Sequence, residues 1–300
     1  MSELWSRLGF LAIALVVYRI GTHIPIPGIN PEQVAALFQQ SQGTILQYFN
    51  LFSGGALERM SIFALSVVPY ISSAIVMQLF SNSVPYLQEL KKDGQAGRNK
   101  ITQYTRYGTV IFALIQSSAL TVTLQTAGLI DAGSIFSAFV AVISIVTGTM
   151  FLMWLGEQIS ERGIGNGISI IIATSIITGV PRAFGQALEQ TQQGDLNYLL
   201  LIVLAVLTLL VVAFVVFVEN AQRKITVNYA QRNQVRGMIQ APSSFLPLKL
   251  NMSGVIPAIF ASTFLLFPAS LSSWFGNIDG LGGLQEFSLY LNPGQPLYIL

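Results

Sequence analysis

The chain is a succession of long apolar segments separated by short polar ones. Spanning the hydrocarbon core of a membrane takes about 20 mostly apolar residues in a helix. Segments of that length recur along the chain, and most are bounded by Gly, Pro or Asn, which are typical helix stops. Seven membrane-spanning helices are predicted, at 6–24, 60–82, 107–128, 134–156, 166–185, 197–218 and 252–275. The polar GIGNG run at Gly163–Gly167 is expected to form a tight turn that lets the fourth and fifth helices pack closely.

The stretch from Tyr48 to Phe80 departs from this pattern. From about Met60 onward it is apolar enough to lie in a membrane, but the part before it carries two adjacent glycines and the pair Glu58–Arg59. This combination predicts a short polar half-helix that leads into a full membrane helix. Irregular backbone at membrane depth is tolerated where it lines a cavity. The pattern therefore favours a protein that moves something through such a cavity.

Composition gives the same broad class. The chain has 300 residues, of which 52% are hydrophobic and only 9% are charged, whereas soluble domains carry about a quarter charged residues. There is no cysteine, so disulfides and thiol chemistry are excluded. No cleavable signal peptide is expected, because the first apolar run lacks a small-residue cleavage site and continues into His23–Gly28. The sequence predicts an all-α, polytopic helix bundle of the inner-membrane type.

Charge orients the predicted helices. If the N-terminus lies in the cytoplasm, only Arg59 and Arg182 fall on the opposite side, and Arg19 lies within the first span. The other 12 of the 15 basic residues are then cytoplasmic: Arg7, Lys91, Lys92, Arg98, Lys100, Arg106, Arg162, Arg223, Lys224, Arg232, Arg236 and Lys249. Basic residues concentrate in cytoplasmic loops, so a cytoplasmic N-terminus is predicted.

Two predicted cytoplasmic loops carry most of this charge, Pro85–Tyr104 and Glu219–Leu250. Such loops can simply fix topology and contact anionic lipid, or they can dock an acidic partner or ribosomal RNA. The residues alone leave both interpretations open. Within the second loop, KITVNYAQRNQVRGM alternates apolar and polar positions, which predicts a β-ribbon that projects from the membrane.

Familiar chemistries find no support. The single histidine, His23, lies beside prolines without a cluster of potential metal ligands, and no HExxH, GxSxG or Walker motif occurs. We therefore expect no enzymatic activity, no metal and no cofactor. Acidic residues are essentially absent from the middle of the predicted spans, which disfavours ion-coupled transport. A secondary transporter for small molecules remains the alternative function, and a structural subunit is a third.

Branched aliphatic residues are the candidates for lining a pore. Val67 and Ile71 are four residues apart and bracket Pro69, which is expected to bend the second span, while Ile172 and Ile259 lie in the fifth and seventh. Spacing alone favours ordinary packing roles for all four. A constriction of such side chains would nevertheless resist ions and accept any polypeptide sequence, because it makes no specific hydrogen bonds.

Six extended motifs occur in order along the chain. They are RIGTHIPIPGI (19–29), FNLFSGGALER (49–59), VPYISSAIVMQL (68–79), GRNKITQYTRYGT (97–109), GEQISERGIGNGISIII (156–172) and LNMSGVIPAIFAS (250–262). In these motifs the chain closely resembles the SecY family of bacterial protein-conducting channels, and the resemblance runs from the first span to the last residue.

The resemblance implies an hourglass pore between two pseudo-symmetric halves. Here these would be residues 1–185, with the plug at about 48–60, and an incomplete second half, 197–300, with spans six and seven, the start of an eighth and the basic loop 219–250. The implied sites are a pore ring (Val67, Ile71, Ile172, Ile259), a plug half-helix (Phe49, Asn50, Phe52, Ser53, Gly54, Gly55, Leu57, Arg59), a polar cluster in a lateral gate (Ser72, Gln116, Asn251) and a docking loop (Arg223, Lys224, Arg232, Arg236).

The implied function is that of the central channel-forming subunit of the protein translocase. Such channels pass unfolded secretory proteins across the bacterial plasma membrane and release membrane helices laterally into it. The implied partners are SecE, SecG, the SecA motor, the ribosome, signal sequences, nascent membrane proteins and lipid. Family members have ten spans, so this chain is expected to lack the last three.

Overall fold

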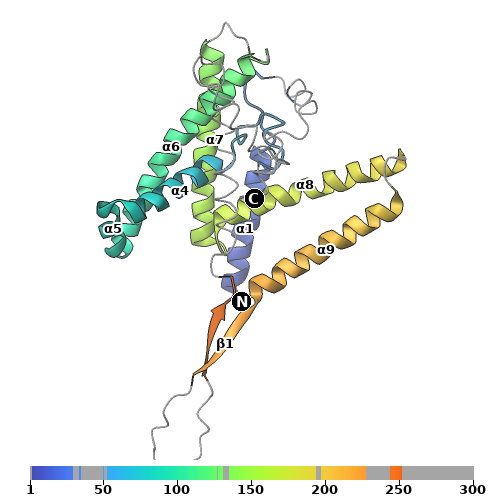
Figure 1. Cartoon of the computed structure of the whole chain (residues 1–300). Helices are drawn as coiled ribbons and strands as arrows, with labels where there is room; N and C mark the ends of the chain where they lie inside the picture. The colour runs from blue at the N-terminus through green and yellow to red at the C-terminus, as the bar shows by residue number, and fades with distance from the viewer. Residues whose placement is uncertain are drawn as a thin grey trace, which may run out of the picture. The chain divides into compact units, whose positions relative to one another are not determined.

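The computed structural model of the chain describes residues 2–29, 34, 50, 53–126, 128–130, 135–193, 197–227 and 244–251. They form helices and one small ribbon: α1 (Ser2–Gly21), α4 (Val68–Ser83), α5 (Pro85–Lys92), α6 (Gln95–Thr126), α7 (Ile135–Arg162), α8 (Gly167–Gln192), α9 (Tyr198–Asn220), β1 (Gln222–Val227) and β2 (Ser244–Lys249) (Figure 1). The chain divides into two compact units, one formed by the described residues up to Ala183 and one by those from Phe184 to Asn251.

Five of the described helices are long and apolar enough to cross a membrane: α1 from Glu3 onward, α6, α7, α8 and α9. They correspond to the first, third, fourth, fifth and sixth predicted spans, and the prediction of an all-α membrane bundle is confirmed. The seventh predicted span, 252–275, lies outside the described residues.

The second predicted span begins later than the hydrophobic pattern indicated. Helix α4 starts at Val68 rather than near Met60, and the residues before it form turns. Met60 and Ser66 have φ values of +43° and +51°, in the left-handed region that a right-handed helix excludes. Pro69 lies in the first turn of α4, where its missing N–H has no helical partner to lose. The prediction that Pro69 bends the span is therefore wrong, because the helix starts there.

The predicted loop 85–104 is mostly helical. It contains α5, and α6 already begins at Gln95, well before the predicted start at 107. Leu87 and Leu90 of α5 are buried, and a Cβ at Gly97 would collide with the carbonyl of Leu90. This close approach lets α5 fold back against the first turns of α6.

Helices α4, α6 and α7 pack side by side through small residues (Figure 1). The buried stripe of α6 repeats every fourth residue: Thr105, Thr109, Ala113, Ser117, Thr121. Threonine hydroxyls on this stripe donate to the carbonyl one turn earlier, as from Thr109 Oγ1 to Thr105 O at 2.8 Å. Lipid offers no hydrogen-bond partner to these hydroxyl groups. Because each hydroxyl bonds to its own helix, small polar residues can line the contacts between helices.

The turn between α7 and α8 is as tight as the GIGNG motif predicted. Ser160 Oγ accepts a hydrogen bond from Gly167 N at 2.8 Å, and Asn166 Oδ1 accepts from Ile168 N at 3.1 Å. A Cβ at Gly167 would strike the carbonyl of Gly156 and approach Ile159 Cβ to 2.8 Å. Glycine at Gly156 and Gly167 therefore permits the close packing of these two helices.

The second unit contains α9 and the ribbon. Asn197 caps α9 by accepting from Leu199 N at 3.2 Å, and no side chain of α9 is buried in the described part of the chain. Strands β1 and β2 pair antiparallel, with Gln222 opposite Lys249 and Val227 opposite Ser244. The predicted β-ribbon is confirmed, although its second strand lies beyond the KITVNYAQRNQVRGM segment.

Candidate functional site

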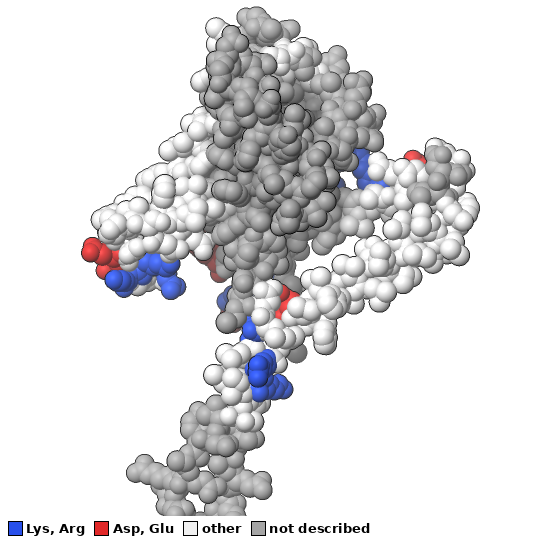
Figure 2. Space-filling view, viewed as in Figure 1, with Lys and Arg blue, Asp and Glu red and all other residues white. Residues whose placement is uncertain are grey.

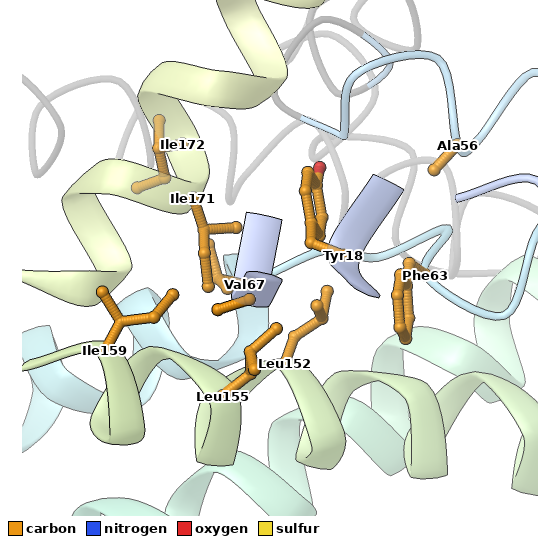
Figure 3. Packing of buried hydrophobic residues seen from close by; sticks show 10 residues of the cluster. Tyr18, Ala56, Phe63, Val67, Leu152, Leu155, Ile159, Ile171 and Ile172 are labelled. Carbon is orange, nitrogen blue, oxygen red and sulfur yellow. The ribbon is translucent and has the colours of Figure 1, made fainter. Parts of the chain in front are cut away.

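A hydrophobic cluster joins α1, α7, α8 and the segment that precedes α4. Figure 3 shows residues of this cluster pointing toward one another from separate elements. Its buried members are Ala14, Tyr18, Ala56, Phe63, Val67, Leu152, Leu155, Ile159, Ile171 and Ile172. The rings of Tyr18 and Phe63 stack with centroids 6.1 Å apart. The cluster thus connects elements far apart in the sequence.

Three of the four predicted pore-ring residues meet in this cluster. Val67 and Ile172 are buried members, and Ile71 packs against it while remaining partly exposed. Val67 is the N-cap residue directly before α4, and Ile172 lies in the second turn of α8. Ile259 lies outside the described residues. The sequence thus selected residues that share a location, and their role in a pore stays a prediction.

The predicted plug, where it is described, is a series of turns rather than a half-helix. We call residues 53–59 the plug segment. Gly54 and Gly55 have φ values of +64° and +81°, so the backbone at both positions lies in the left-handed region. The backbone hydrogen bonds of the plug segment do not follow one helical pattern. Ala56 N donates to the carbonyl three residues earlier, Ser53 O, at 3.3 Å, whereas Arg59 N donates to the carbonyl four residues earlier, Gly55 O, at 3.4 Å. Phe49 and Phe52 lie outside the described residues.

Tyr18 fastens the plug segment between α1 and α8. Its hydroxyl lies 2.5 Å from Ser175 Oγ and 3.4 Å from Ser53 O. Tyr18 and Ser175 are both fully buried. Gly54 packs against the same place on α8, because a Cβ there would lie 3.2 Å from Ser175 Cα. A larger residue at Gly54 would therefore displace the segment from α8.

Glu58 is the most constrained charge of the plug segment. One of its carboxylate oxygens accepts from Arg182 of α8 at 2.7 Å and from Asn50 Nδ2 at 3.2 Å. The backbone N–H of Glu58 donates to Asn50 Oδ1 at 3.0 Å. The side chain of Glu58 is only 15% exposed. Asn50 thus holds both the backbone and the carboxylate of Glu58.

Two further arginines make contacts in or beside the plug segment. Arg59 donates to His23 Nε2 at 2.9 Å, and Arg19 donates to Gly54 O at 3.4 Å. Partial burial and the neighbouring guanidinium groups of Arg19 and Arg182 lower the pKa of Arg59, and Glu58 opposes that shift. The electrostatic surroundings of Arg59 therefore combine two other arginines with one carboxylate.

The C-terminal end of the plug segment continues into a backbone clamp. Ile26 N donates to Met60 O at 2.8 Å, and Ile62 N donates to Ile24 O at 3.0 Å. These bonds flank an antiparallel bridge between Pro25 and Ser61. Main-chain hydrogen bonds fix this end of the segment, whereas its contacts with α8 are made through side chains and Gly54.

The predicted lateral-gate residues belong to both units. Ser72 is buried on α4, and Gln116 is half-buried on the adjacent α6. The buried Oε1 of Gln116 has no hydrogen-bond partner among the described residues. Asn251 belongs to the second unit, where its Nδ2 donates to Glu219 Oε2 at 3.0 Å. Their joint role in a gate stays a prediction.

Two of the predicted docking residues lie on β1. Arg223 and Lys224 are exposed, and Lys224 Nζ lies 4.8 Å from the centre of the Phe245 ring on β2. Figure 2 shows basic side chains grouped on this ribbon. Arg232 and Arg236 lie outside the described residues.

The sequence did not single out Tyr18, Ser175 and Arg182, which anchor the plug segment. Each carries a polar or charged group in or near a predicted span. A buried hydroxyl in an apolar span needs a hydrogen-bond partner. The sequence could therefore have predicted that Tyr18 and Ser175 each form a hydrogen bond. Their mutual partnership was not detectable, because 157 positions separate them.

These features define a class: a polytopic helical membrane protein with an irregular segment held against its spanning helices. In fold it matches a solved protein-conducting channel with a TM-score of 0.66 at 18% identity, over 91% of this chain and 59% of that one. It matches equally well, at 19% identity, the SecY channel whose plug domain is described as stabilising the closed state and maintaining a membrane seal.

Sequence comparison identifies the family. The SecY family model matches residues 61–300. The chain is 58% identical to protein translocase subunit SecY of Pseudomonas aeruginosa and 55% identical to that of Escherichia coli K12. Both alignments cover all of this chain, and it spans 68% and 69% of those proteins. The chain belongs to the SecY family.

Proposed function

We propose that this chain forms the polypeptide-conducting path of a protein translocase. Unfolded secretory proteins would pass through it across the membrane, and hydrophobic segments would leave it sideways into lipid. The observation that carries this proposal is the cluster in which Val67, Ile71 and Ile172 meet, and which also includes Ala56 of the plug segment. The relatives of this chain in Pseudomonas aeruginosa and Escherichia coli are named protein translocase subunit SecY.

The chemistry of the cluster suits such a path. Branched aliphatic side chains offer contact without specific hydrogen bonds, so they accept any sequence and disfavour hydrated ions. Ala56 of the plug segment is fully buried in the same cluster. Conduction requires the segment to leave, and no covalent chemistry is assigned to any residue.

The proposed orientation places the N-terminus and the ribbon in the cytoplasm of a bacterium, by the distribution of basic residues. Arg223 and Lys224 then offer a basic surface to a motor or a ribosome. One structural neighbour is a Sec61 channel in a ribosome–channel complex, matched at a TM-score of 0.64. We extend the proposed partners to SecE, SecG, SecA, signal sequences and nascent membrane proteins.

Crosslinking of a translocating chain tests the proposal. Single cysteines at Ile71, Ile172 and Ile259 would be probed with a secretory precursor stalled during export, and the absence of native cysteine keeps the background clean. A matched control is Ile177→Cys on the same helix as Ile172, since Ile177 is 65% exposed and outside the cluster.

We expect adducts at Ile71, Ile172 and Ile259 and none at Ile177. Adducts at none of the three, with the precursor engaged elsewhere on the protein, would overturn the assignment of the path. Saturable uptake of a small solute by vesicles that contain the protein, without passage of peptides, would favour a secondary transporter instead.

A further inference from the structure

Two different kinds of contact hold the C-terminal end of the plug segment. Near Met60 the contacts are backbone hydrogen bonds to Ile24 and Ile26, which no side-chain change removes. At Glu58 the contact with α8 is an ion pair to Arg182, a residue 124 positions away in the sequence. Two neighbouring positions are thus held differently, Met60 by main-chain hydrogen bonds and Glu58 by a charge.

The Glu58–Arg182 pair is suited to reversible opening. Its carboxylate is mostly buried while its guanidinium is 58% exposed, so solvent and salt reach the pair and weaken it. Asn50 orients Glu58 from both its backbone and its side chain. The carboxylate is therefore presented to α8 without a large entropic cost for ordering it.

The charges around Glu58 are unbalanced, which makes its removal more damaging than removal of Arg182. Arg19 and Arg182 both repel Arg59, and Glu58 attracts it. Without Glu58, three cations would face one another with less compensation. Without Arg182, Glu58 would still lie beside Arg59 and Asn50.

We infer that Glu58 and Arg182 form an electrostatic latch that holds the plug segment against α8. This inference rests on the proposed function only for the purpose of the latch. The latch itself is a property of the closed structure, and it can be measured without any translocating chain.

The test measures how often the plug segment opens. Ala56 is fully buried, so a single cysteine introduced by Ala56→Cys reacts with a membrane-impermeant maleimide only when the segment leaves the cluster. The labelling rate would be measured in membrane vesicles from cells that express the protein. Variants Glu58→Gln, Arg182→Gln and the charge exchange Glu58→Arg with Arg182→Glu would be combined with Ala56→Cys. Exposed Arg7, paired with Glu3 at 3.0 Å on α1, supplies a control in Arg7→Gln.

The loss of a partly exposed ion pair changes an equilibrium by about fivefold. We expect Glu58→Gln to raise the labelling rate by about fivefold, Arg182→Gln to raise it less, and Arg7→Gln to leave it unchanged. The charge exchange should lower the rate again relative to Glu58→Arg alone. High salt should speed labelling of the parent and not of Glu58→Gln.

Unchanged labelling in Glu58→Gln, or a charge exchange no slower to label than Glu58→Arg alone, would overturn the latch. Export of a secretory reporter, measured in the same cells, separates this inference from the proposed function. Normal export with unchanged labelling rejects the latch alone. Absent export in the parent, with the expected labelling changes, supports the latch and rejects the proposed function.

Discussion

The buried hydrogen bond between Tyr18 and Ser175 gives a sharp energetic prediction. Ser175 Oγ donates to Ile171 O at 2.8 Å, which uses its one hydrogen. The short 2.5 Å contact therefore requires Tyr18 to donate and Ser175 to accept. In Tyr18→Phe the ring still stacks on Phe63, so the substitution removes the hydroxyl and little packing.

The expected magnitude follows from the environment of this bond. Hydrogen bonds between membrane helices contribute about 0.6 kcal/mol on average and up to about 1.7 kcal/mol. Both side chains are fully buried and the bond is short, so we expect a coupling energy near the upper part of this range. A double-mutant cycle of Tyr18→Phe, Ser175→Ala and the double variant isolates that pairwise energy.

The assay is the free energy of unfolding of the purified protein in lipid–detergent mixtures. Tyr107→Phe is a matched control, since it deletes the same hydroxyl from a side chain that is 58% exposed and accepts from Gln103 Nε2. That control should change stability by less than about 0.5 kcal/mol. Equal effects of Tyr18→Phe and Tyr107→Phe, or zero coupling in the cycle, would refute the reasoning.

Three further predictions concern packing, conduction and docking. Gly148→Ala should destabilise the protein by about 1–3 kcal/mol in the same assay, because the new Cβ would strike the Ile62 carbonyl. Gly9→Ala, with open space around it, should be neutral or stabilising by up to about 1 kcal/mol, and a reversed order would contradict the packing argument. Val67→Ser and Ile172→Ser should raise the resting ion conductance in planar bilayers, unlike Ile177→Ser, and unchanged conductance would remove both from the pore ring. Charge reversal at Arg223, Lys224, Arg232 and Arg236 should weaken motor or ribosome binding and leave helical content intact, and normal affinity would leave this loop a role in topology only.

The sequence predicted the spanning helices well, because length and hydropathy largely determine them. It failed where the hydrophobic pattern and the backbone conformation diverge. Residues 60–67 are apolar enough to form part of a helix, yet Met60 and Ser66 have left-handed φ values. Helix α4 therefore begins only at Val68, with Pro69 in its first turn. Hydropathy does not report on φ, so the extra turns were invisible to it.

The candidate site was predicted in part for a similar reason. Val67, Ile71 and Ile172 were selected through family motifs, and the structure brings them into one cluster. The plug segment was expected to be helical, but Gly54 and Gly55 form turns there. Two adjacent glycines allow such turns without requiring them. The ion pair of Glu58 with Arg182 depends on tertiary contacts that no local pattern encodes.

Helix α9 has a consequence for the order in which the protein is made. Its most apolar window has a mean hydropathy of 3.4, and none of its side chains is buried in the described part of the chain. Leu, Ile, Val and Phe each favour membrane insertion by about 0.3–0.6 kcal/mol at the centre of a helix, so this segment gains several kcal/mol on entering lipid alone. It therefore needs no help from earlier helices to integrate during synthesis. Docking onto later segments can be postponed until these have left the ribosome.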